Sequence, residues 1–377
     1  MSLRRFCRHA LLLSAVAFQP AYALINLNQG KDLIFVNSTY SFGYDSNVFT
    51  RAVAQSSVTH NVSLATDYTR QAGIISVAAN AAVAAGLFQD LPEQNFIDPS
   101  FELTLRKRYG RTTGSLDLLA RRESQPDPDV GQRTEDWNYA GNFDLRYPVN
   151  DRYYFTNNAG YSGTFYTNKN AFSDLRAISE AIALNYIYTS KLALNAGYTV
   201  LFSDTSRDSR ATDHSFTVGA SGGILPKLTG NLRFGYQLRD NRSATAGNET
   251  FDAITSSTQL KWRYSRNLTV TGEYNASFST TAADLPINRS ALGLHAEVAL
   301  AGPYTGEFGA VYTHTAFLGQ AGDDRRDELV QLDASIRLAL TRHVRAALGY
   351  SYMLNASNSA AFDFSRHTVA LSITAAY

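Results

Sequence analysis

Cysteine is the scarcest residue in this 377-residue sequence, which contains only Cys7. That cysteine lies in a segment with three arginines among the first eight residues, an apolar run over 10–18 and an Ala-Tyr-Ala ending, which is the composition of an export signal. We predict cleavage after Ala23, so that residues 1–23 are a signal peptide and residues 24–377 form the mature chain. Because cleavage removes Cys7, the mature chain would have no disulfide, thiolate nucleophile or cysteine-bound metal.

Long apolar runs and an excess of one charge are also missing. No later segment has the roughly 18 consecutive apolar residues that a helical membrane span requires. The whole chain has 34 basic and 33 acidic residues, and removal of the three signal-peptide arginines leaves 31 and 33, a net charge of −2. These absences exclude a helical membrane protein and give no reason to expect nucleic acid or an anionic membrane surface as a partner.

The sequence contains a repeated unit of two segments, each with alternating apolar and polar residues, joined by a few turn-forming residues. Eight short turns follow one another, at "TRQAG", "RYGRT", "PVND", "TSK", "ILPKL", "SRN", "LAGPYTG" and "ALTRHVR". Longer polar connections lie between these hairpins, such as "TNKNAFSDLR", "DTSRDSRATD" and "RDNRSATAGNET". Short turns at one end and long loops at the other are typical of outer-membrane β-barrels, in which the short turns are periplasmic and the long loops extracellular.

The alternation places apolar residues on one face of each segment and polar residues on the other, which is the period of a β-strand. In "YSFGYDSNVFTR" at 40–51, Tyr40, Phe42 and Tyr44 share the face predicted to meet lipid. The alternation stops at Asp45-Ser46-Asn47, whose side chains can bond their own backbone and begin a turn. We therefore expect the first strand to leave the bilayer at this point.

Eight hairpins, one strand before them and the final strand "HTVALSITAAY" give about 18 strands. The predicted fold class is all-β, a transmembrane antiparallel up-and-down barrel in the outer membrane of a Gram-negative bacterium. Because a sequence pattern defines strand ends poorly, about 16 strands is the competing count. A soluble sandwich would also alternate, but it would seldom keep strands this long, whereas bilayer spans tilted by about 45° need roughly 9 to 11 residues.

Aromatic residues gather beside the short turns, where an amphipathic ring is stable at the level of the lipid headgroups. This set is Tyr147, Tyr153, Tyr186, Tyr188, Trp262, Tyr264 and Tyr304, with Tyr377 as the last residue. Their shared position predicts an aromatic girdle at the periplasmic membrane interface.

The first predicted strand ends in "GYDSNVFTR" at 43–51, hairpins follow, and the last strand is the aromatic-terminated "ALSITAAY". In these features the chain resembles the beta-barrel porin type 2 family, barrels associated with exopolysaccharide synthesis and export. The resemblance implies polysaccharide or small solutes as partners. The last strand also resembles the signal read by the barrel-assembly machinery, in which Val369, Leu371 and Ile373 alternate before the terminal Tyr377, although Tyr stands in place of the commoner Phe.

Enzyme chemistry in a barrel would need a nucleophile or an activated water beside a positioned base. The histidines after residue 23 do not form the His beside a Ser-Asn pair that outer-membrane phospholipases carry as a family. His314 in "THTAF" and His214 in "DHS" come nearest, and we interpret both as loop or interface residues. No two histidines have the spacing of a zinc site, and "GASGG" at 219–223 lacks the Lys and the helix of a phosphate loop. We predict no enzyme activity, metal or cofactor.

Charged residues on the faces opposite to lipid are the candidate pore-lining residues. One wall, on the fourth to sixth strands, carries Arg106, Arg108, Arg121 and Arg146 beside Glu102, Asp117, Glu123 and Asp144. The eleventh and twelfth strands carry Arg233, Arg239, Lys261 and Arg263, and Arg337 and Arg345 lie further round. Mixed charges could form a lateral field across water, and a basic stripe would favour anionic solutes. The alternative is that these residues are polar only because water fills the barrel.

A plug domain is not expected, since only about ten residues, Leu24 to about Leu33, precede the first strand. A barrel of about 18 strands leaves a channel unless an external loop folds in, and "RESQPDPDVGQRTED" at 122–136 is the loop that we expect to do so. The predicted function is an outer-membrane channel linked to extracellular polysaccharide export or to diffusion of small polar or anionic solutes. A non-conducting structural or polysaccharide-binding surface barrel is the second hypothesis, and a barrel hydrolase is the third.

Overall fold

The computed structural model of the protein describes residues 25–28, 31–71, 73–243, 247–319 and 325–377. The predicted signal peptide, with Cys7, lies outside the described residues. Among the residues described, no helix has the length and apolar character needed to cross a membrane.

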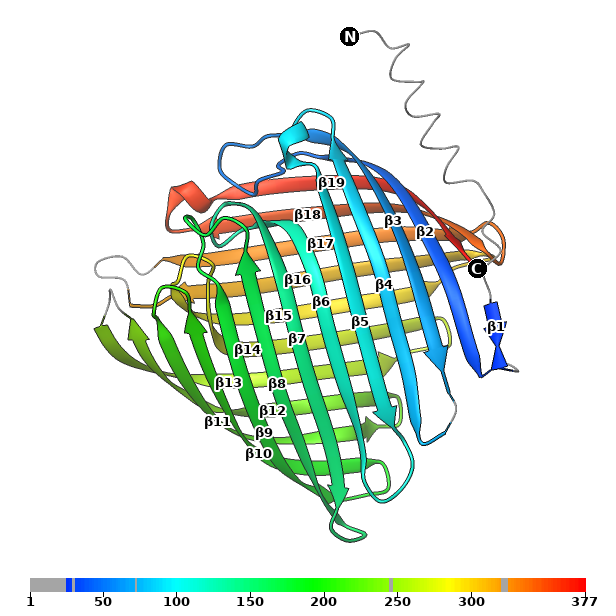
Figure 1. Cartoon of the computed structure of the whole chain (residues 1–377), viewed down its shortest axis with the longest axis vertical. Helices are drawn as coiled ribbons and strands as arrows, with labels where there is room; N and C mark the ends of the chain where they lie inside the picture. Colours follow the sequence, from blue (N-terminus) through cyan, green and yellow to red (C-terminus); the bar gives the residue numbers. More distant parts are fainter. Residues whose placement is uncertain (1–24, 29–30, 72, 244–246, 320–324) are drawn as a thin grey trace.

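The described strands form one antiparallel sheet in which each strand pairs with its neighbours in sequence, and β19 closes the ring by pairing with β2. Figure 1 shows the resulting cylinder. The barrel strands are β2 (Asp32–Asp45), β3 (Ser57–Arg70), β4 (Ile75–Phe88), β5 (Phe96–Lys107), β6 (Thr113–Asp127), β7 (Gln132–Pro148), β8 (Tyr153–Tyr166), β9 (Leu175–Ile187), β10 (Leu192–Thr205), β11 (Arg210–Leu225), β12 (Leu228–Ser243), β13 (Gly247–Arg263), β14 (Leu268–Thr280), β15 (Pro286–Ala299), β16 (Tyr304–Phe317), β17 (Arg326–Ala339), β18 (Val344–Ser357) and β19 (Phe364–Ala376). The prediction of a closed barrel of eighteen strands is confirmed, and the competing count of sixteen is wrong.

A short extra strand, β1 (Ile25–Leu27), pairs with the start of β2 and was not expected from the sequence. In Figure 1 it lies beside the C-terminus, at the end of the barrel that carries the short turns. All eight short turns predicted from the sequence join consecutive strands at this end. The opposite end carries the longer connections, which include two short 3₁₀ helices, Pro92–Gln94 and Ala360–Phe362.

Alternate residues of each strand present apolar side chains on the outside of the cylinder. Phe42 and Tyr44 of β2 are exposed, as the alternation in the first strand predicted. Ile254 of β13 is 72% exposed, although it is a large aliphatic residue in the middle of a long strand. An aqueous protein would bury such residues, so this outward band is the surface that meets lipid.

The seam between β2 and β19 is fastened at both ends. At the short-turn end, the backbone of Tyr377 exchanges hydrogen bonds of 2.9 and 3.0 Å with that of Val36. At the other end, the Asp45 carboxylate accepts bonds of 3.0 and 2.7 Å from the Arg366 guanidinium and one of 3.0 Å from the backbone N–H of Asn47. The last contact confirms that a turn begins at Asp45, and Val48 just beyond it is 0% exposed.

Aromatic residues line the outside of the short-turn end. Tyr153 and Tyr186 place their ring centroids 5.2 Å apart, and Trp262 meets Tyr264 edge-on at 5.1 Å. The Tyr377 ring stacks on His343 at 4.8 Å. The exposed rings at this end match the predicted periplasmic girdle.

Candidate functional site

The charged residues singled out in the sequence occupy inward positions of their strands. On β5, Ile97 and Phe101 are exposed on the outside, so Glu102 and Arg106 of the other parity point inward. The register carries this relation round the ring, because residues paired directly across two strands share a face. By the same alternation the inward set includes Asp117, Arg121, Glu123, Asp144, Arg146, Arg233, Arg239, Lys261, Arg263, Arg337 and Arg345, while Arg108 lies in the turn after β5.

Seven of these cations form no ion pair with any described residue. They are Arg106, Arg108, Arg146, Arg233, Lys261, Arg263 and Arg345. Arg146 instead lies over the ring of Tyr154, with its guanidinium carbon 3.9 Å from the ring centroid. Cations without a partner leave positive charge available to whatever enters the barrel.

Arg239 differs from the other basic residues of the predicted stripe. Its relative exposure is only 1%, and its Nε and Nη2 atoms donate to the two carboxylate oxygens of Asp213 at 2.6 and 2.8 Å. A third bond of 2.6 Å runs from Nη1 to the backbone oxygen of Ser279. Because every face of this guanidinium is occupied by protein, Arg239 fastens β12 to β11 and β14 and does not extend the basic stripe.

Two further arginines are also compensated. Arg121 Nη2 lies 3.2 Å from the Glu123 carboxylate, two residues along β6. Arg337 of β17 lies 2.5 Å from Glu307 of β16. These pairs reduce the net charge of their part of the wall, so the uncompensated cations are confined to β5, β7, β12, β13, β18 and the turn after β5.

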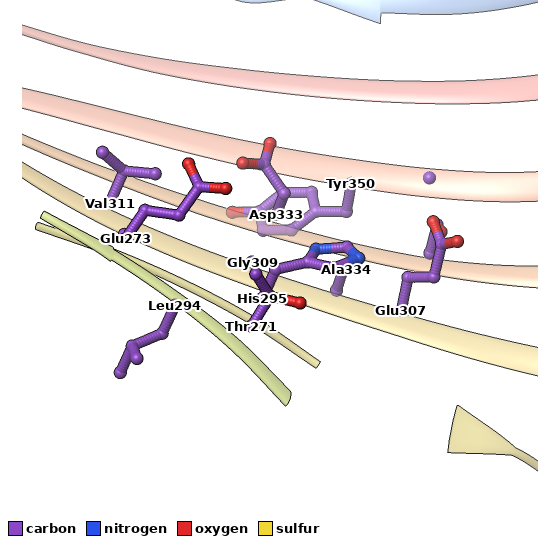
Figure 2. Close-up of a pocket in the computed structure, with 13 residues that line it drawn as sticks. Thr271, Glu273, Leu294, His295, Glu307, Gly309, Val311, Asp333, Ala334 and Tyr350 are labelled. Atoms are coloured by element: carbon purple, nitrogen blue, oxygen red, sulfur yellow. The ribbon is translucent and has the colours of Figure 1, made fainter. Parts of the chain in front are cut away.

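An acidic group, not recognised in the sequence, lies on the wall facing β5 to β7. Glu273, Glu297, Glu307 and Asp333 occupy inward positions on four successive strands, β14 to β17. Figure 2 shows three of them around His295, in a cavity of about 380 Å³. In a ring of eighteen strands, β14 is nine strands from β5. These acids therefore lie across the barrel from Arg106 and Arg146, although the wall of β5 to β7 also carries the carboxylates of Glu102, Asp117, Glu123 and Asp144.

A larger cavity of about 750 Å³ lies against the inner wall from β5 to β12. Arg106, Arg146 and Arg233 line it, together with the amides of Asn185 and Asn195. This is the size range of small-molecule sites, and the lining combines cations with neutral polar groups.

The hairpin of β6 and β7 reaches across the barrel at the end with the long loops. Its tip is Asp127-Pro128-Asp129-Val130-Gly131, in which the backbone N–H of Asp129 donates to Asp127 Oδ1 at 2.9 Å and Gly131 adopts a φ of 64°. The Asp129 carboxylate pairs with Arg289 of β15. β6 and β15 are nine strands apart in the ring, so the tip spans its full width. The loop expected to fold in does so, although most of 122–136 continues the strands and only its tip is a turn.

The side chain of Arg325, just before β17, binds backbone carbonyl oxygens of the same tip. Nη1 donates to the Asp129 carbonyl oxygen at 2.7 Å and Nη2 to that of Pro128 at 3.4 Å. The guanidinium also pairs with Asp327 and lies between two rings, 4.1 Å from the centroid of Phe317 and 3.2 Å from that of Phe362. A cation fixed on all sides in this way is a rigid anchor for the tip.

Apolar contacts complete the closure of the mouth. Val130, at the tip, packs with Leu175 against a buried cluster of Tyr166, Phe172 and Ala282. These residues come from three extracellular connections, and the backbone N–H of Ser173 donates to the Ala282 carbonyl at 2.8 Å. The long loops therefore meet one another above the lumen.

Asp127 is one of the titratable groups affected by this closure. It lies beyond the apolar outer band, since the outward residues of β6 after Ala120 are Arg122, Ser124 and Pro126. Burial, and then the neighbouring Asp129 carboxylate, raise the pKa of Asp127 to about 6. Its protonation therefore changes near neutral pH.

Comparison with known proteins settles the family. The family model described as "Putative beta-barrel porin 2" matches residues 150–377. The chain belongs to this family. The matched residues include the last strand of the porin, whereas the segment 43–51 lies outside them. No curated protein matches the chain.

Two solved structures from Pseudomonas aeruginosa share the fold of this porin. OccK2 (OpdF) in complex with glucuronate is 13% identical with a TM-score of 0.51, and the match covers 92% of this chain and 98% of that one. OccK9 (OpdG) is 11% identical with a TM-score of 0.51, and the match again covers 92% and 98%. Family and fold place the porin in the outer membrane of a Gram-negative bacterium.

The histidines considered for hydrolysis face outward in the porin. His214 of β11 lies 2.7 Å from the hydroxyl of Tyr198 through its Nδ1. His314 of β16 pairs in register with Ser290 on one side and Glu328 on the other, but these three side chains form no hydrogen bond with one another among the contacts described. The structure therefore places both histidines on the outer face, His214 bonded to a tyrosine hydroxyl and His314 between two register partners.

One carboxylate also faces outward within the apolar band. Glu180 of β9 lies between the exposed Ile178 and Ile182 and accepts a hydrogen bond from the Asn157 side chain of β8. An ionisable group in contact with lipid is costly, so a polar partner is expected beside it.

Proposed function

We propose that this porin is a passive channel for small anionic or sugar-like solutes, connected with extracellular polysaccharide. The fold supplies a water-accessible interior, and the loops narrow it only at the extracellular end. The observation that carries the proposal is a set of cations without ion-pair partners among the described residues: six are inward, Arg106, Arg146, Arg233, Lys261, Arg263 and Arg345, and Arg108 lies in the turn after β5. Charged groups lining a pore set its selectivity, and unpaired cations favour anions.

The solute class follows from the rest of the wall. Amide and hydroxyl side chains lie between the arginines of the larger cavity, and such groups suit hydroxylated solutes. The OccK2 structure was solved with glucuronate, a sugar acid that combines both requirements, and we propose solutes of this kind for the present channel. The same wall also carries four carboxylates, whose negative charge would reduce the anion selectivity. They are Glu102, Asp117, Glu123 and Asp144.

We also propose how the chain is processed and inserted into the outer membrane. Residues 1–23 would be removed on export, and residues 24–377 would be inserted by the barrel-assembly machinery through the last strand. Mass spectrometry of protein purified from outer membranes tests the first point, since a mature chain that still contained Cys7 would contradict cleavage.

The test of the channel is planar-bilayer recording of the purified protein. Conductance steps are expected, and their reversal potential in a salt gradient should show anion preference. Replacing Arg233, Lys261 and Arg263 by glutamine should shift the reversal potential toward cations. The matched control replaces Arg210, Arg242 and Arg326, which are outward and exposed, and should leave it unchanged. An unchanged preference in the first variant would contradict the role of the basic residues.

A second candidate is a structural or polysaccharide-binding barrel that does not conduct. The observation that favours it is the β6–β7 tip, which spans the mouth and is held on the opposite wall. Absence of conductance steps from folded protein would support this candidate and contradict the channel. A barrel hydrolase would instead require turnover of phospholipid or ester substrates that is lost on replacement of His314 or His214.

A further inference from the structure

Charge is divided unequally between the two ends of the barrel, although the whole chain is nearly neutral. The eight short turns contain one acid, Asp151, and seven cations, Arg108, Arg111, Arg152, Lys191, Lys227, Arg266 and Arg342. The described residues of the longer connections have the reverse balance. They contain four cations, Arg51, Lys169, Arg207 and Arg325, and seven acids, Asp90, Glu93, Asp129, Asp174, Asp208, Asp284 and Asp363. The periplasmic turns are therefore basic, whereas the extracellular connections are acidic.

Six of the turn cations are available to a partner outside the lumen. Arg108 is set aside, because it lines the larger cavity. The other six residues are exposed, and none forms an ion pair with a residue that the structure describes. We call these six the basic rim, which consists of Arg111, Arg152, Lys191, Lys227, Arg266 and Arg342. Cations gathered at one edge without acidic partners attract anions to that edge.

The basic rim adjoins the aromatic girdle. The guanidinium carbon of Arg111 lies 5.3 Å from the ring centroid of Tyr147, and Lys227 Nζ donates to the Tyr264 carbonyl oxygen at 3.1 Å. The short turns contain only two to five residues each, so the remaining rim cations cannot lie far from the girdle. Because the rings of such a girdle lie among the lipid headgroups, the rim cations lie at or just beyond the same level.

An anionic phospholipid headgroup is the partner that this arrangement fits. The periplasmic leaflet of an outer membrane consists of phospholipids, and basic residues beside a membrane surface attract those with a net negative headgroup. An acidic soluble protein offers the same charge, but a compact one would meet only part of the barrel end. The rim cations extend over six turns, from the one between β5 and β6 to the one between β17 and β18. A lipid leaflet surrounds the barrel and reaches all of these turns.

We propose that the basic rim binds anionic phospholipids of the periplasmic leaflet and thereby holds the aromatic girdle at a fixed depth. The nearly neutral charge of the chain gave no reason to expect an anionic membrane surface as a partner, because acids in the lumen and in the extracellular connections offset the basic turns. The proposal goes beyond the channel and does not depend on it, since the rim lies outside the lumen.

The two tryptophans of the chain report on the two leaflets separately. Trp262 lies in the girdle, on the strand that precedes the turn of Arg266 and in register with Leu228, next to Lys227. Trp137 of β7 lies toward the extracellular end. Trp137→Phe therefore leaves one reporter at the rim, and Trp262→Phe leaves one at the opposite end. Both leaflets of a vesicle have the same composition, so this assignment holds for either direction of insertion.

The measurement is the displacement of brominated phosphatidylcholine, which quenches tryptophan fluorescence, by unbrominated phosphatidylglycerol. At Trp262, phosphatidylglycerol should bind about fivefold more tightly than phosphatidylcholine, which is the factor for one cation acting on one headgroup. Lys227→Gln with Arg266→Gln should bring this ratio to about one. The matched control, Arg210→Gln with Arg326→Gln, removes two exposed cations at the other end of the barrel and should leave the ratio unchanged. The gel-mobility shift of unheated barrels verifies that every variant is folded.

The outcomes decide between the possible partners. A preference at Trp262 that is lost in the Lys227 and Arg266 variant, and is absent at Trp137, would support the proposal. Equal binding of the two lipids at Trp262 would overturn it and leave the basic rim to an acidic soluble partner. A preference that survives the loss of Lys227 and Arg266, or that is as large at Trp137, would also overturn it. Absence of conductance steps would refute the channel without affecting these ratios, so the two failures are distinguishable.

Discussion

Releasing the β6–β7 tip from the opposite wall should widen the channel. The perturbation is the double substitution Arg325→Met with Asp327→Asn. Methionine keeps the apolar contact with Phe317 and Phe362, while loss of the guanidinium removes both hydrogen bonds to the tip. The second substitution is needed because a single change would leave the Asp327 carboxylate, which is 4% exposed, buried without its partner.

The magnitude follows from the contacts of the tip. A hydrogen bond from a charged donor contributes about 1.5–3 kcal/mol, and the bond of Arg325 to Pro128 is long, so the two together amount to about 3 kcal/mol. The Asp129–Arg289 pair and the packing of Val130 add about 1 kcal/mol each. A total near 5 kcal/mol leaves the tip undocked about once in 5,000 molecules, and removal of 3 kcal/mol raises this to about one in 30.

Single-channel recording measures this change directly. The wild type should stay at one conductance, with rare excursions to a larger one, and the double variant should visit the larger conductance roughly 150 times more often. Arg326→Gln is the matched control, because its side chain is outward, exposed and adjacent in sequence to Arg325. Identical conductance distributions in the wild type and the double variant would refute the assignment of the tip as the constriction.

Three further predictions concern charged groups elsewhere. Glu180→Gln keeps the hydrogen bond from Asn157 but removes a charge that faces lipid. In urea titrations of the barrel in vesicles, this variant should have an unfolding free energy about 1 kcal/mol higher than the wild type. A loss of stability would mean that the charge has a partner other than lipid. Docking of the tip raises the pKa of Asp127 from 3.8 to about 6, so docking should strengthen as pH falls from 7 toward 4, by at most about 3 kcal/mol. Single-channel recordings should therefore show fewer openings to the larger conductance at pH 5 than at pH 7. Asp127→Asn should abolish this pH dependence. Asp213→Ala leaves the guanidinium of Arg239 buried without its partner and should cost about 3–5 kcal/mol in the same urea assay, whereas little change would mean that water replaces the carboxylate.

The sequence predicted the features that depend on neighbouring residues. Alternation with a period of two assigns each residue of a strand to lipid or lumen, so the inward positions of Arg106 and Lys261 could be deduced without knowledge of their partners. Turn residues such as the "PVND" at 148–151 fix the hairpins in the same local way. The count of eighteen strands followed from adding the hairpins predicted in this way to the first and the last strand.

Features that depend on alignment between strands could not be predicted. Whether Arg239 points into water or onto Asp213 depends on the register of β11 against β12, which the alternation leaves undefined. The composition of 122–136 indicated a loop able to fold inward, but its destination at Arg289 depends on the number of strands, because only a ring of eighteen puts β6 opposite β15. The alternation was enough to place Glu273 and Glu307 on inward faces. Their position across the barrel from the arginines, however, also depends on the number of strands.

The seam joining β19 to β2 has a consequence for biogenesis. The two partners are the first and the last strands of the cylinder to be synthesised, so a chain that ends before β19 lacks the partner that β2 has in this barrel. The fastening of Asp45 to Arg366 and of Val36 to Tyr377 can then be made only by a finished polypeptide. Closure of the cylinder therefore requires the chain through β19, because without that strand β2 has an unpaired edge.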